Sequence, residues 1–503
     1  MKIESRVLTQ QDVADSLDAE LAAPPRLLPQ DTTYPALRAN LLNAADWVHD
    51  RLIGAEFVPT PEETVGANKP GHGIRPIAIW DIPSRVAYRA LAQRVEHRLP
   101  PLLRSRSQHQ AFQRGPLGRD GRYIVAADIA ACYQNLDHGL VLDEIAVQTG
   151  DHEAVASLRA LLREATGRAY GLPQQSHASD VLAEAFLAKL ERSLIRRRLV
   201  VDRYNDDFRF TCDTWSDVVR SLEVLEEETR LVGLTVNDMK TVTWGRTKYQ
   251  THLDAADGLR QHIADDAEFD LTVFDADTYR GVVVEPPEAD EVEILSAVRV
   301  LERWAKVAGR GRAAQNRRPE HRAIVELLPF ALSTLRRQTG TLPEILNHCT
   351  QLLRFERTMT PAVATYLLDR NDDSAVIAAI DRLLTGRSYL NGWQTWWLQE
   401  PVARLQGFAT GVGAQRRLRW ARGALTSAEQ SPVLRAEAAR TLARHRRIPV
   451  DEIIGIYDRS SDIVRPVLAG AAALLKPGAD VRRAIVGDSR LNEWAYDWAA
   501  QFA

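Results

Sequence analysis

Cysteine is scarce in this 503-residue sequence, which contains only Cys132, Cys212 and Cys349. Three scattered thiols, an odd number, exclude a disulfide framework and argue against a cysteine-ligated zinc site. Such sparing use of cysteine is typical of a reducing compartment, so we expect a cytoplasmic protein.

Long apolar runs and a surplus of one charge are missing as well. The opening residues Met1–Arg6 lack the apolar core of a signal peptide, and no later run reaches the ~18 apolar residues of a membrane span. We therefore expect no membrane partner. The formal net charge of −3 excludes a uniformly basic nucleic-acid binder, so any polynucleotide site must be a local patch.

What is present is enough apolar sequence for a large core. With 45% hydrophobic residues, the chain is long enough for two or three domains. Residues 1–55 predict an N-terminal helical segment of short helices, broken at Ala23-Pro24-Pro25 and at Tyr34-Pro35.

The most informative stretch is Arg203–Phe208, with the sequence Arg-Tyr-Asn-Asp-Asp-Phe. It lies between the apolar run Leu199–Val201 and the alternating run Phe208–Cys212, a pattern that predicts strand, tight turn, strand. Asp206 and Asp207 then project from a hairpin tip, where neighbouring like charges persist if they are protonated, solvated or bound to cations. Asn and Asp are also ordinary turn residues, so the pair alone does not establish a site.

A second carboxylate follows an apolar run at Tyr123–Ala127. This pattern predicts a buried central strand that delivers Asp128 to the edge of a sheet. Because an unpartnered buried carboxylate is costly, we expect a cation or an arginine beside it. Tyr133 lies where the chain leaves this strand, either under the sugar of a bound nucleotide or in the core.

Three further segments carry candidate nucleotide contacts. Lys69 and Arg75 stand on either side of the glycine-rich segment Pro70–Gly73. They either hold a triphosphate or belong to a solvated hairpin. Gly171–Ser179 leads into a helix, whose first turn is a natural site for a nucleotide or a template strand. Lys240 follows a helix that ends near Gly233, and it either approaches a pyrophosphate leaving group or is exposed.

In this order the segments resemble the fingers and palm of a reverse transcriptase, over roughly residues 60 to 250. Asp128 with Tyr133 resembles the first palm motif, and Pro173-Gln174 with Ser179 the second. Tyr204-Asn205-Asp206-Asp207 resembles the Tyr-x-Asp-Asp signature, and Gly233 through Lys240 the fourth motif. One departure is Gln175, which stands where this family usually has glycine after Pro-Gln.

The resemblance implies nucleotidyl transfer with two Mg²⁺ (or Mn²⁺) ions, for which carboxylates are suitable hard ligands. It makes Asp128, Asp206 and Asp207 the catalytic metal ligands, with Asp207 the more peripheral. It also implies nucleotide contacts by a wider set of residues: Lys69, Arg75, Tyr133, Gln174, Ser179 and Lys240. Tyr133 would exclude a 2′-hydroxyl, so the expected substrates are dNTPs and the product is DNA.

Beyond about residue 290 the pattern is almost entirely helical. The segments Val433-Leu434-Arg435 and Ile463-Val464-Arg465 recur thirty residues apart, each before an alanine-rich helix. Such recurrence is typical of HEAT-like helical pairs, although an ordinary bundle would also fit. The expected fold class is α+β: a right-hand polymerase fingers and palm domain over residues 56–285, then an all-α HEAT-like repeat domain over residues 286–503.

A palm followed by helical repeats resembles the bacterial abortive-infection and related defence reverse transcriptases. That resemblance implies anti-phage defence, assembly into homo-oligomers, and DNA synthesis that is untemplated and protein-primed. The priming residue is unknown, and five candidates are not ranked: Tyr34, Tyr366, Tyr389, Tyr457 and Tyr496.

Other interpretations remain open. One is a templated reverse transcriptase that uses a bound noncoding RNA, and another is a non-catalytic nucleic-acid-binding repeat protein. A nucleotide cyclase also carries paired aspartates, but it has no use for Pro173-Gln174 and Tyr133.

Overall fold

The computed structural model describes residues 3–54, 57–69, 73–271, 273–277, 281–285, 289–308, 319–338, 343–385 and 389–503. By their internal contacts these residues form two compact units. The first unit comprises Met1–Val65, Pro76–Gln250 and Val450–Ala503, and the second comprises Gly66–Arg75 and Thr251–Pro449.

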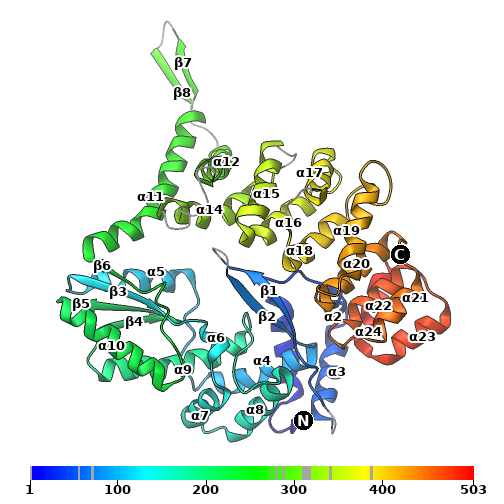
Figure 1. Cartoon of the computed structure of the whole chain (residues 1–503), viewed down its shortest axis with the longest axis horizontal. Coiled ribbons are helices and arrows are strands. Elements are labelled where there is room, and N and C mark those ends of the chain that lie inside the picture. Colours follow the sequence, from blue (N-terminus) through cyan, green and yellow to red (C-terminus); the bar gives the residue numbers. More distant parts are fainter. Residues whose placement is uncertain are drawn as a thin grey trace. The chain divides into compact units, whose positions relative to one another are not determined.

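The first unit contains a four-stranded antiparallel sheet (Figure 1). In the order β4-β5-β3-β6, its strands are Val201–Tyr204, Asp207–Cys212, Tyr123–Asp128 and Val242–Gly245. The near-continuous apolar sequence of β3 is explained by its central place, since a strand with neighbours on both edges and covered faces has little contact with water. The predicted strand, turn and strand around Asp206 are confirmed.

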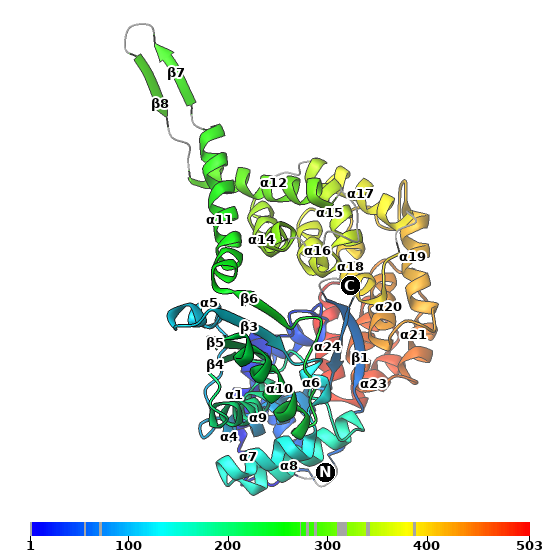
Figure 2. The same ribbon diagram turned by 60° about the vertical axis from the view of Figure 1, so that its left-hand side comes forward.

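Helices α9 and α10 pack against this sheet (Figure 2). Phe208 and Phe210 of β5 are fully buried in the same core. The helices of this part of the chain are α4 (Ile82–Glu96), α5 (Arg106–Arg114), α6 (Cys132–Asn135), α7 (His138–Thr149), α8 (His152–Thr166), α9 (His177–Arg196), α10 (Trp215–Leu231) and α11 (Arg246–Leu271), with a 3-10 turn at Gly115–Gly118.

The N-terminal segment folds into α1 (Gln10–Ala22), α2 (Thr33–Ala39) and α3 (Leu41–Ile53). The predicted break after Ala22 is confirmed, but the predicted break at Tyr34-Pro35 is wrong. Both residues lie in the first turn of α2, where proline is tolerated because its missing N–H would have no helical partner.

The last helices of the chain belong to the first unit. They are α21 (Val450–Tyr457), α22 (Arg465–Leu474), α23 (Ala479–Asp488) and α24 (Arg490–Ala500). Helix α24 packs on α2, and Trp494 meets Trp47 of α3 edge to face with ring centroids 5.8 Å apart. The C-terminal helices are therefore part of the core that supports the sheet.

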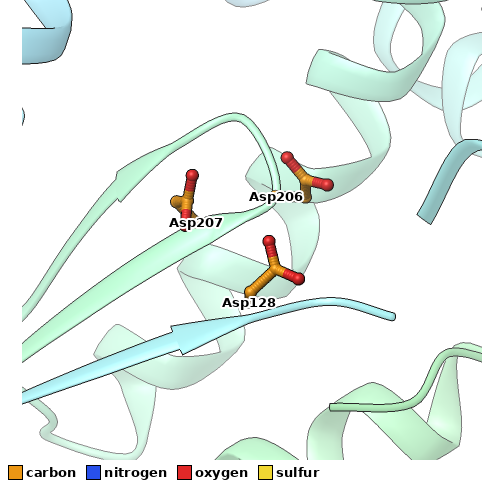
Figure 3. Close-up of side chains that lie close together, drawn as sticks. All are labelled: Asp128, Asp206 and Asp207. Atoms are coloured by element: carbon orange, nitrogen blue, oxygen red, sulfur yellow. The ribbon is translucent and has the colours of Figure 1, made fainter. Parts of the chain in front are cut away.

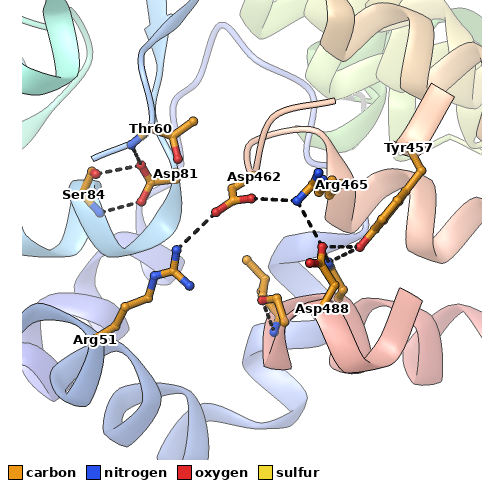
Figure 4. A network of polar contacts seen from close by, with 11 residues as sticks. Arg51, Thr60, Asp81, Ser84, Tyr457, Asp462, Arg465 and Asp488 are labelled. Carbon is orange, nitrogen blue, oxygen red and sulfur yellow. Dashed lines mark hydrogen bonds and ion pairs between the residues drawn. The ribbon is translucent and has the colours of Figure 1, made fainter. Parts of the chain in front are cut away.

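Polar contacts reinforce this junction (Figure 4). The Arg51 guanidinium lies 3.2 Å from an Asp462 carboxylate oxygen, and Arg465 lies between Asp462 and Asp488 at 3.5 and 3.2 Å. Tyr457 donates to Asp488 at 2.7 Å. This chain of contacts connects α3 to the helices beyond Val450.

The second unit is mainly helical. Its helices are α12 (Ala289–Ala308), α14 (Pro319–Arg336), α15 (Pro343–Phe355), α16 (Thr360–Leu368), α17 (Ser374–Thr385), α18 (Gly392–Ala403), α19 (Ala414–Thr426) and α20 (Pro432–Arg444), with a 3-10 turn at Arg357–Met359. Helices α14, α16, α18 and α20 pack in succession, and so do α15, α17 and α19. Alternate helices thus form two adjacent layers, which is how stacked helical pairs are arranged. Trp393 and Trp396 of α18 are buried and belong to the hydrophobic core.

Two β-hairpins lie outside the four-stranded sheet. Strands β1 (Glu63–Asn68) and β2 (Ile74–Ile79) form one, and β7 (Val273–Asp277) and β8 (Gly281–Glu285) form the other. Residues 70–72 of the predicted glycine-rich turn lie outside the described residues, as do the positions next to the predicted boundaries at 55 and 285, so those boundaries stay predictions. Among the described residues, every helix is too short or too polar to cross a membrane.

Candidate active site and metal centre

Asp128 is the last residue of β3, and its partner across the antiparallel ladder is Asp207, the first residue of β5. Cross-strand partners place their side chains on the same face of a sheet, so strand pairing alone brings these two carboxylates together. Asp128 is buried, as the apolar run before it predicts.

Asp206 is held by the turn between β4 and β5. Tyr204 pairs with Asp207, which leaves Asn205 and Asp206 as a two-residue turn. Asn205 has φ = 60°, a left-handed conformation that asparagine tolerates better than most residues. The Asp206 carbonyl accepts from the Ile129 N–H at 3.1 Å, which connects the turn to the chain just after Asp128.

Beneath the turn lies the guanidinium of Arg203, which is almost fully buried and paired with the equally buried Glu184 of α9. Its Nη1 donates to the Asn205 carbonyl at 3.1 Å, and its Nε lies 3.0 Å from the Glu191 carboxylate. The turn that carries Asp206 is therefore held from below by α9.

The three carboxylates converge (Figure 3). Asp128, Asp206 and Asp207 each offer an oxygen within 4.8 Å of the other two. Burial, together with the charges of Asp128 and Asp207, raises the pKa of Asp206 to about 6. Burial also raises the pKa of Asp207, where Arg209 opposes the shift. A divalent cation relieves this repulsion, and carboxylate oxygens are the ligands that Mg²⁺ prefers, so the three residues fit a metal ion.

Two side chains from the loop after α10 contact Asp128. Lys240 Nζ donates to Oδ1 at 2.9 Å, and Asn237 Nδ2 donates to Oδ2 at 3.0 Å. The Asn237 N–H also donates to the Asp128 carbonyl at 2.7 Å, which fixes the loop to the strand end. The expectation that a buried Asp128 has a cation beside it is confirmed, and in this structure that cation is Lys240.

Tyr133 lies on α6, which begins just after Ala131 in a left-handed conformation with φ = 47°. Its hydroxyl donates to Asp180 Oδ1 at 2.6 Å and accepts from Arg104 Nη2 at 2.9 Å. The Tyr133 hydroxyl also lies 3.5 Å from Asn205 Oδ1. Tyr133 is therefore next to the turn between β4 and β5.

The segment before α9 shows why glycine is usual at position 175. Gln175 has φ = 63°, a conformation that glycine adopts without strain. Its side-chain oxygen accepts from the Leu27 N–H at 3.0 Å, which offsets part of that strain. Gln174 is half-buried beside it, whereas Ser179 is fully buried with its hydroxyl 3.0 Å from that of Tyr88.

Lys69 and Arg75 lie on the β1–β2 hairpin, in the part that groups with the second unit. The Lys69 N–H donates to the Gly73 carbonyl at 2.9 Å and closes the hairpin. Their predicted contact with a triphosphate stays a prediction.

Sequence reasoning missed several residues around this site, namely Arg104, Asp180, Glu184, Arg203 as a support, and Asn237. All of them act through contacts between segments far apart in the chain. The one available signal was Glu184 within the otherwise apolar run Val181–Leu187, since a buried charge requires a partner.

Comparison with known protein families finds a match to part of the chain. Residues 67–260 match the family model described as reverse transcriptase (RNA-dependent DNA polymerase). No curated protein matches the chain.

Among solved structures, one that is similar is telomerase from Candida albicans with a fragment of telomeric RNA, at 10% identity and a TM-score of 0.29. The match covers 68% of this chain and 65% of that one, so the chain spans less than two thirds of its length. The family match includes all three carboxylates at the sheet edge, and residues 67–260 are therefore a reverse transcriptase domain, that is, an RNA-dependent DNA polymerase domain.

Proposed function

We propose that this protein is a DNA polymerase of reverse transcriptase type that adds deoxynucleotides by two-metal nucleotidyl transfer. The observation that carries the proposal is the convergence of Asp128, Asp206 and Asp207 from two paired strands and their connecting turn. Polymerisation requires this edge to hold divalent cations, and the burial and mutual repulsion of the three carboxylates favour it.

Within this proposal the three aspartates are the metal ligands, with Mg²⁺ (or Mn²⁺) as the ion. Bound metal would activate the attacking hydroxyl and stabilise the departing pyrophosphate. Asp207 is the more peripheral ligand, because Arg209 lies 3.8 Å from its carboxylate. Lys240 is free to leave Asp128 when metal arrives, since its side chain is 63% exposed.

The proposed nucleotide contacts are those implied by the palm motifs: Lys69, Arg75, Tyr133, Gln174, Ser179 and Lys240. Tyr133 and Lys240 have the strongest support, because both lie within hydrogen-bonding reach of the turn or of Asp128. Ser179 has the weakest, because its hydroxyl is buried against Tyr88. It would act through the position of α9 and not by direct contact.

The biological setting is proposed from architecture: a bacterial anti-phage, abortive-infection system acting in the cytoplasm as a homo-oligomer. What supports it is the region that follows the palm, where alternate helices form two layers in the manner of HEAT-like repeats. In this setting DNA synthesis is untemplated and protein-primed. Synthesis templated by a bound noncoding RNA is the alternative.

A direct experiment incubates the purified chain with Mg²⁺ and each labelled dNTP, then treats the product with protease or RNase before electrophoresis. Label incorporated by the wild type and lost in Asp206→Asn supports the polymerase. Asp143→Asn is the matched control, because Asp143 is an exposed carboxylate of α7 paired with Arg159. Incorporation that persists in Asp206→Asn would overturn the proposal.

The same gel distinguishes the priming modes. Label that stays on polypeptide until protease treatment indicates protein priming, whereas label released by RNase indicates an RNA primer and favours the templated alternative. Among the five candidate tyrosines, Tyr389 is 75% exposed, and Tyr34, Tyr366, Tyr457 and Tyr496 are buried. Tyr389→Phe is therefore the first variant to examine for loss of the label on polypeptide.

A further inference from the structure

The Tyr133 hydroxyl is the meeting point of three segments that lie far apart in the sequence. It donates to the Asp180 carboxylate at 2.6 Å, accepts from Arg104 Nη2 at 2.9 Å, and lies 3.5 Å from Asn205 Oδ1. The Arg104 and Asp180 side chains also face each other at 3.5 Å. The ring of Tyr133 is thus held beside the turn that carries Asp206.

Each of the two charged partners is fixed by its own element. Asp180 lies in the first turn of α9, where the N-terminal end of a helix favours a carboxylate. Arg104 precedes α5, and its N–H donates to the side chain of Gln108, which with Ser105 forms the capping box of that helix. The backbone of each partner is therefore placed independently of Tyr133.

The hydrogen-bond pattern leaves the hydroxyl little freedom. A phenol has one proton to donate, and Asp180 takes it, while Arg104 occupies an acceptor position. Both bonds involve a charged group, and such bonds are stronger than bonds between neutral groups. Burial raises the pKa of Tyr133 well above its usual value, and Asp180 adds to the shift, so the hydroxyl stays protonated.

The Arg104 guanidinium makes few other hydrogen bonds within the described part of the chain that would explain its place. Its Nε and Nη1 are buried without a hydrogen-bond partner in the described part of the chain. Leaving buried donors unpaired costs free energy, so a purely structural arginine would be better paired. The bonds that Arg104 does make through its guanidinium go to Tyr133 and Asp180.

We propose that Asp180 and Arg104 are positioning residues that lock Tyr133 as a rigid edge of the nucleotide site, and thereby set the preference for deoxyribonucleotides over ribonucleotides. The inference rests on the proposed function, in which Tyr133 contacts the nucleotide, and it assigns the ring of Tyr133 to the sugar. A ring that cannot tilt leaves no room for the additional 2′-oxygen of a ribonucleotide. A ring released from Asp180 can move aside and admit it.

The test compares kcat/KM for each dNTP and its ribonucleotide counterpart in the wild type, Asp180→Ala, Asp180→Asn and Tyr133→Phe. Asp180→Ala and Tyr133→Phe should each lower the deoxy-to-ribo ratio about tenfold, the size expected for losing one charge-assisted hydrogen bond. Asp180→Asn keeps an acceptor oxygen and should retain most of the ratio. The double variant should lose no more than either single variant, because both remove the same bond.

A merely structural role would give a different result. If Asp180→Ala slows deoxy- and ribonucleotide incorporation by the same factor, the ratio is unchanged and the proposal is overturned. Asp143→Ala, which removes a carboxylate from an exposed ion pair on α7, is the matched control and should leave the ratio unchanged. Thermal unfolding of each variant shows whether it is folded before the ratio is interpreted.

Equilibrium binding separates this proposal from the proposed function. Dissociation constants for dGTP and GTP are measured with Ca²⁺, as a probe of binding without transfer. A protein that binds dGTP more tightly than GTP, and loses that difference in Asp180→Ala, supports the positioning role even if no polymer forms. Equal binding of both nucleotides by the wild type, or binding of neither, overturns it.

Discussion

Lys240 Nζ lies 2.9 Å from Asp128 Oδ1, so an ammonium group contacts one of the oxygens that a metal ion would need. Asn237 donates to the other oxygen at 3.0 Å. Both oxygens of this carboxylate are thus engaged by the loop after α10. We expect metal binding to displace the lysine, whose side chain is largely exposed and can move into solvent.

This contact predicts that Lys240→Met raises the affinity of the nucleotide-free protein for Mn²⁺. The increase should be about threefold, because an ion pair whose ammonium group is exposed contributes about 1 kcal/mol or less. Titration of Mn²⁺ monitored by electron paramagnetic resonance measures it. Lys248→Met is the control, since Lys248 is an exposed lysine of α11. Weaker Mn²⁺ binding by Lys240→Met would show that the lysine does not compete with metal.

The raised pKa of Asp206 predicts that metal affinity depends on pH. Because burial and the neighbouring carboxylates raise this pKa to about 6, the metal-free protein keeps a proton there at pH 5 and has lost it by pH 7.5. Metal and proton compete for the same oxygens, so Mg²⁺ binding should be about tenfold weaker at pH 5 than at pH 7.5. Calorimetric titration at both values measures the ratio, and Asp206→Asn should show a much smaller dependence.

The same shift has a consequence for folding. A carboxylate with a raised folded-state pKa binds its proton more tightly in the folded state than in the unfolded chain. Ionisation of Asp206 therefore makes the metal-free protein less stable as pH rises from about 4 through about 6. Added Mg²⁺ should reverse this loss above pH 6, and a thermal melting series with and without Mg²⁺ at each pH detects it.

The local parts of the site could be predicted from the sequence. The apolar run before Asp128 and the alternating residues after Asp207 specify strands by their own periodicity, and Asn205 specifies a tight turn. Strand pairing then brings the carboxylates together, and their convergence is confirmed. Helix boundaries were less secure: the N-cap of α10 is Thr214, whose hydroxyl accepts from the N–H of Asp217, although Ser216 nearby is an equally suitable residue type.

Contacts between distant segments could not be predicted. Lys240 reaches Asp128, and Arg104 reaches Tyr133, only because the chain folds back on itself. A helical pattern shows which face of a helix is apolar but not what covers that face. This is why the sequence of α24 does not reveal that Trp494 packs on Trp47.

The buried ion pair between Glu184 and Arg203 leads us to predict a large effect on stability. Glu184→Gln should lower the free energy of unfolding by about 3 kcal/mol, because it leaves the buried Arg203 guanidinium without its closest counter-charge. Urea unfolding measures the loss. The double variant Glu184→Leu with Arg203→Met should be less harmful than Glu184→Gln, since it removes both charges from the interior.

A matched surface variant gives the baseline. Asp143→Asn disrupts the exposed pair with Arg159 and should change the free energy of unfolding by less than about 1 kcal/mol. If Glu184→Gln were as mild as Asp143→Asn, the ion pair would not stabilise the turn. Activity should fall in Glu184→Gln even where the protein remains folded, because Arg203 also holds the Asn205 carbonyl.

Because the C-terminal helices α21–α24 belong to the first unit, we predict that this unit is not stable without them. Trp494→Ala should lower the free energy of unfolding by about 3 kcal/mol, because it empties space in the core shared with α3. Trp215→Ala is the control, since Trp215 is 59% exposed on α10 and its loss should cost far less. Removal of Val450–Ala503 should abolish folding of the first unit and with it Mn²⁺ binding by Asp128, Asp206 and Asp207. A chain ending at Pro449 that binds Mn²⁺ and melts like the wild type would show instead that these helices are dispensable for the sheet.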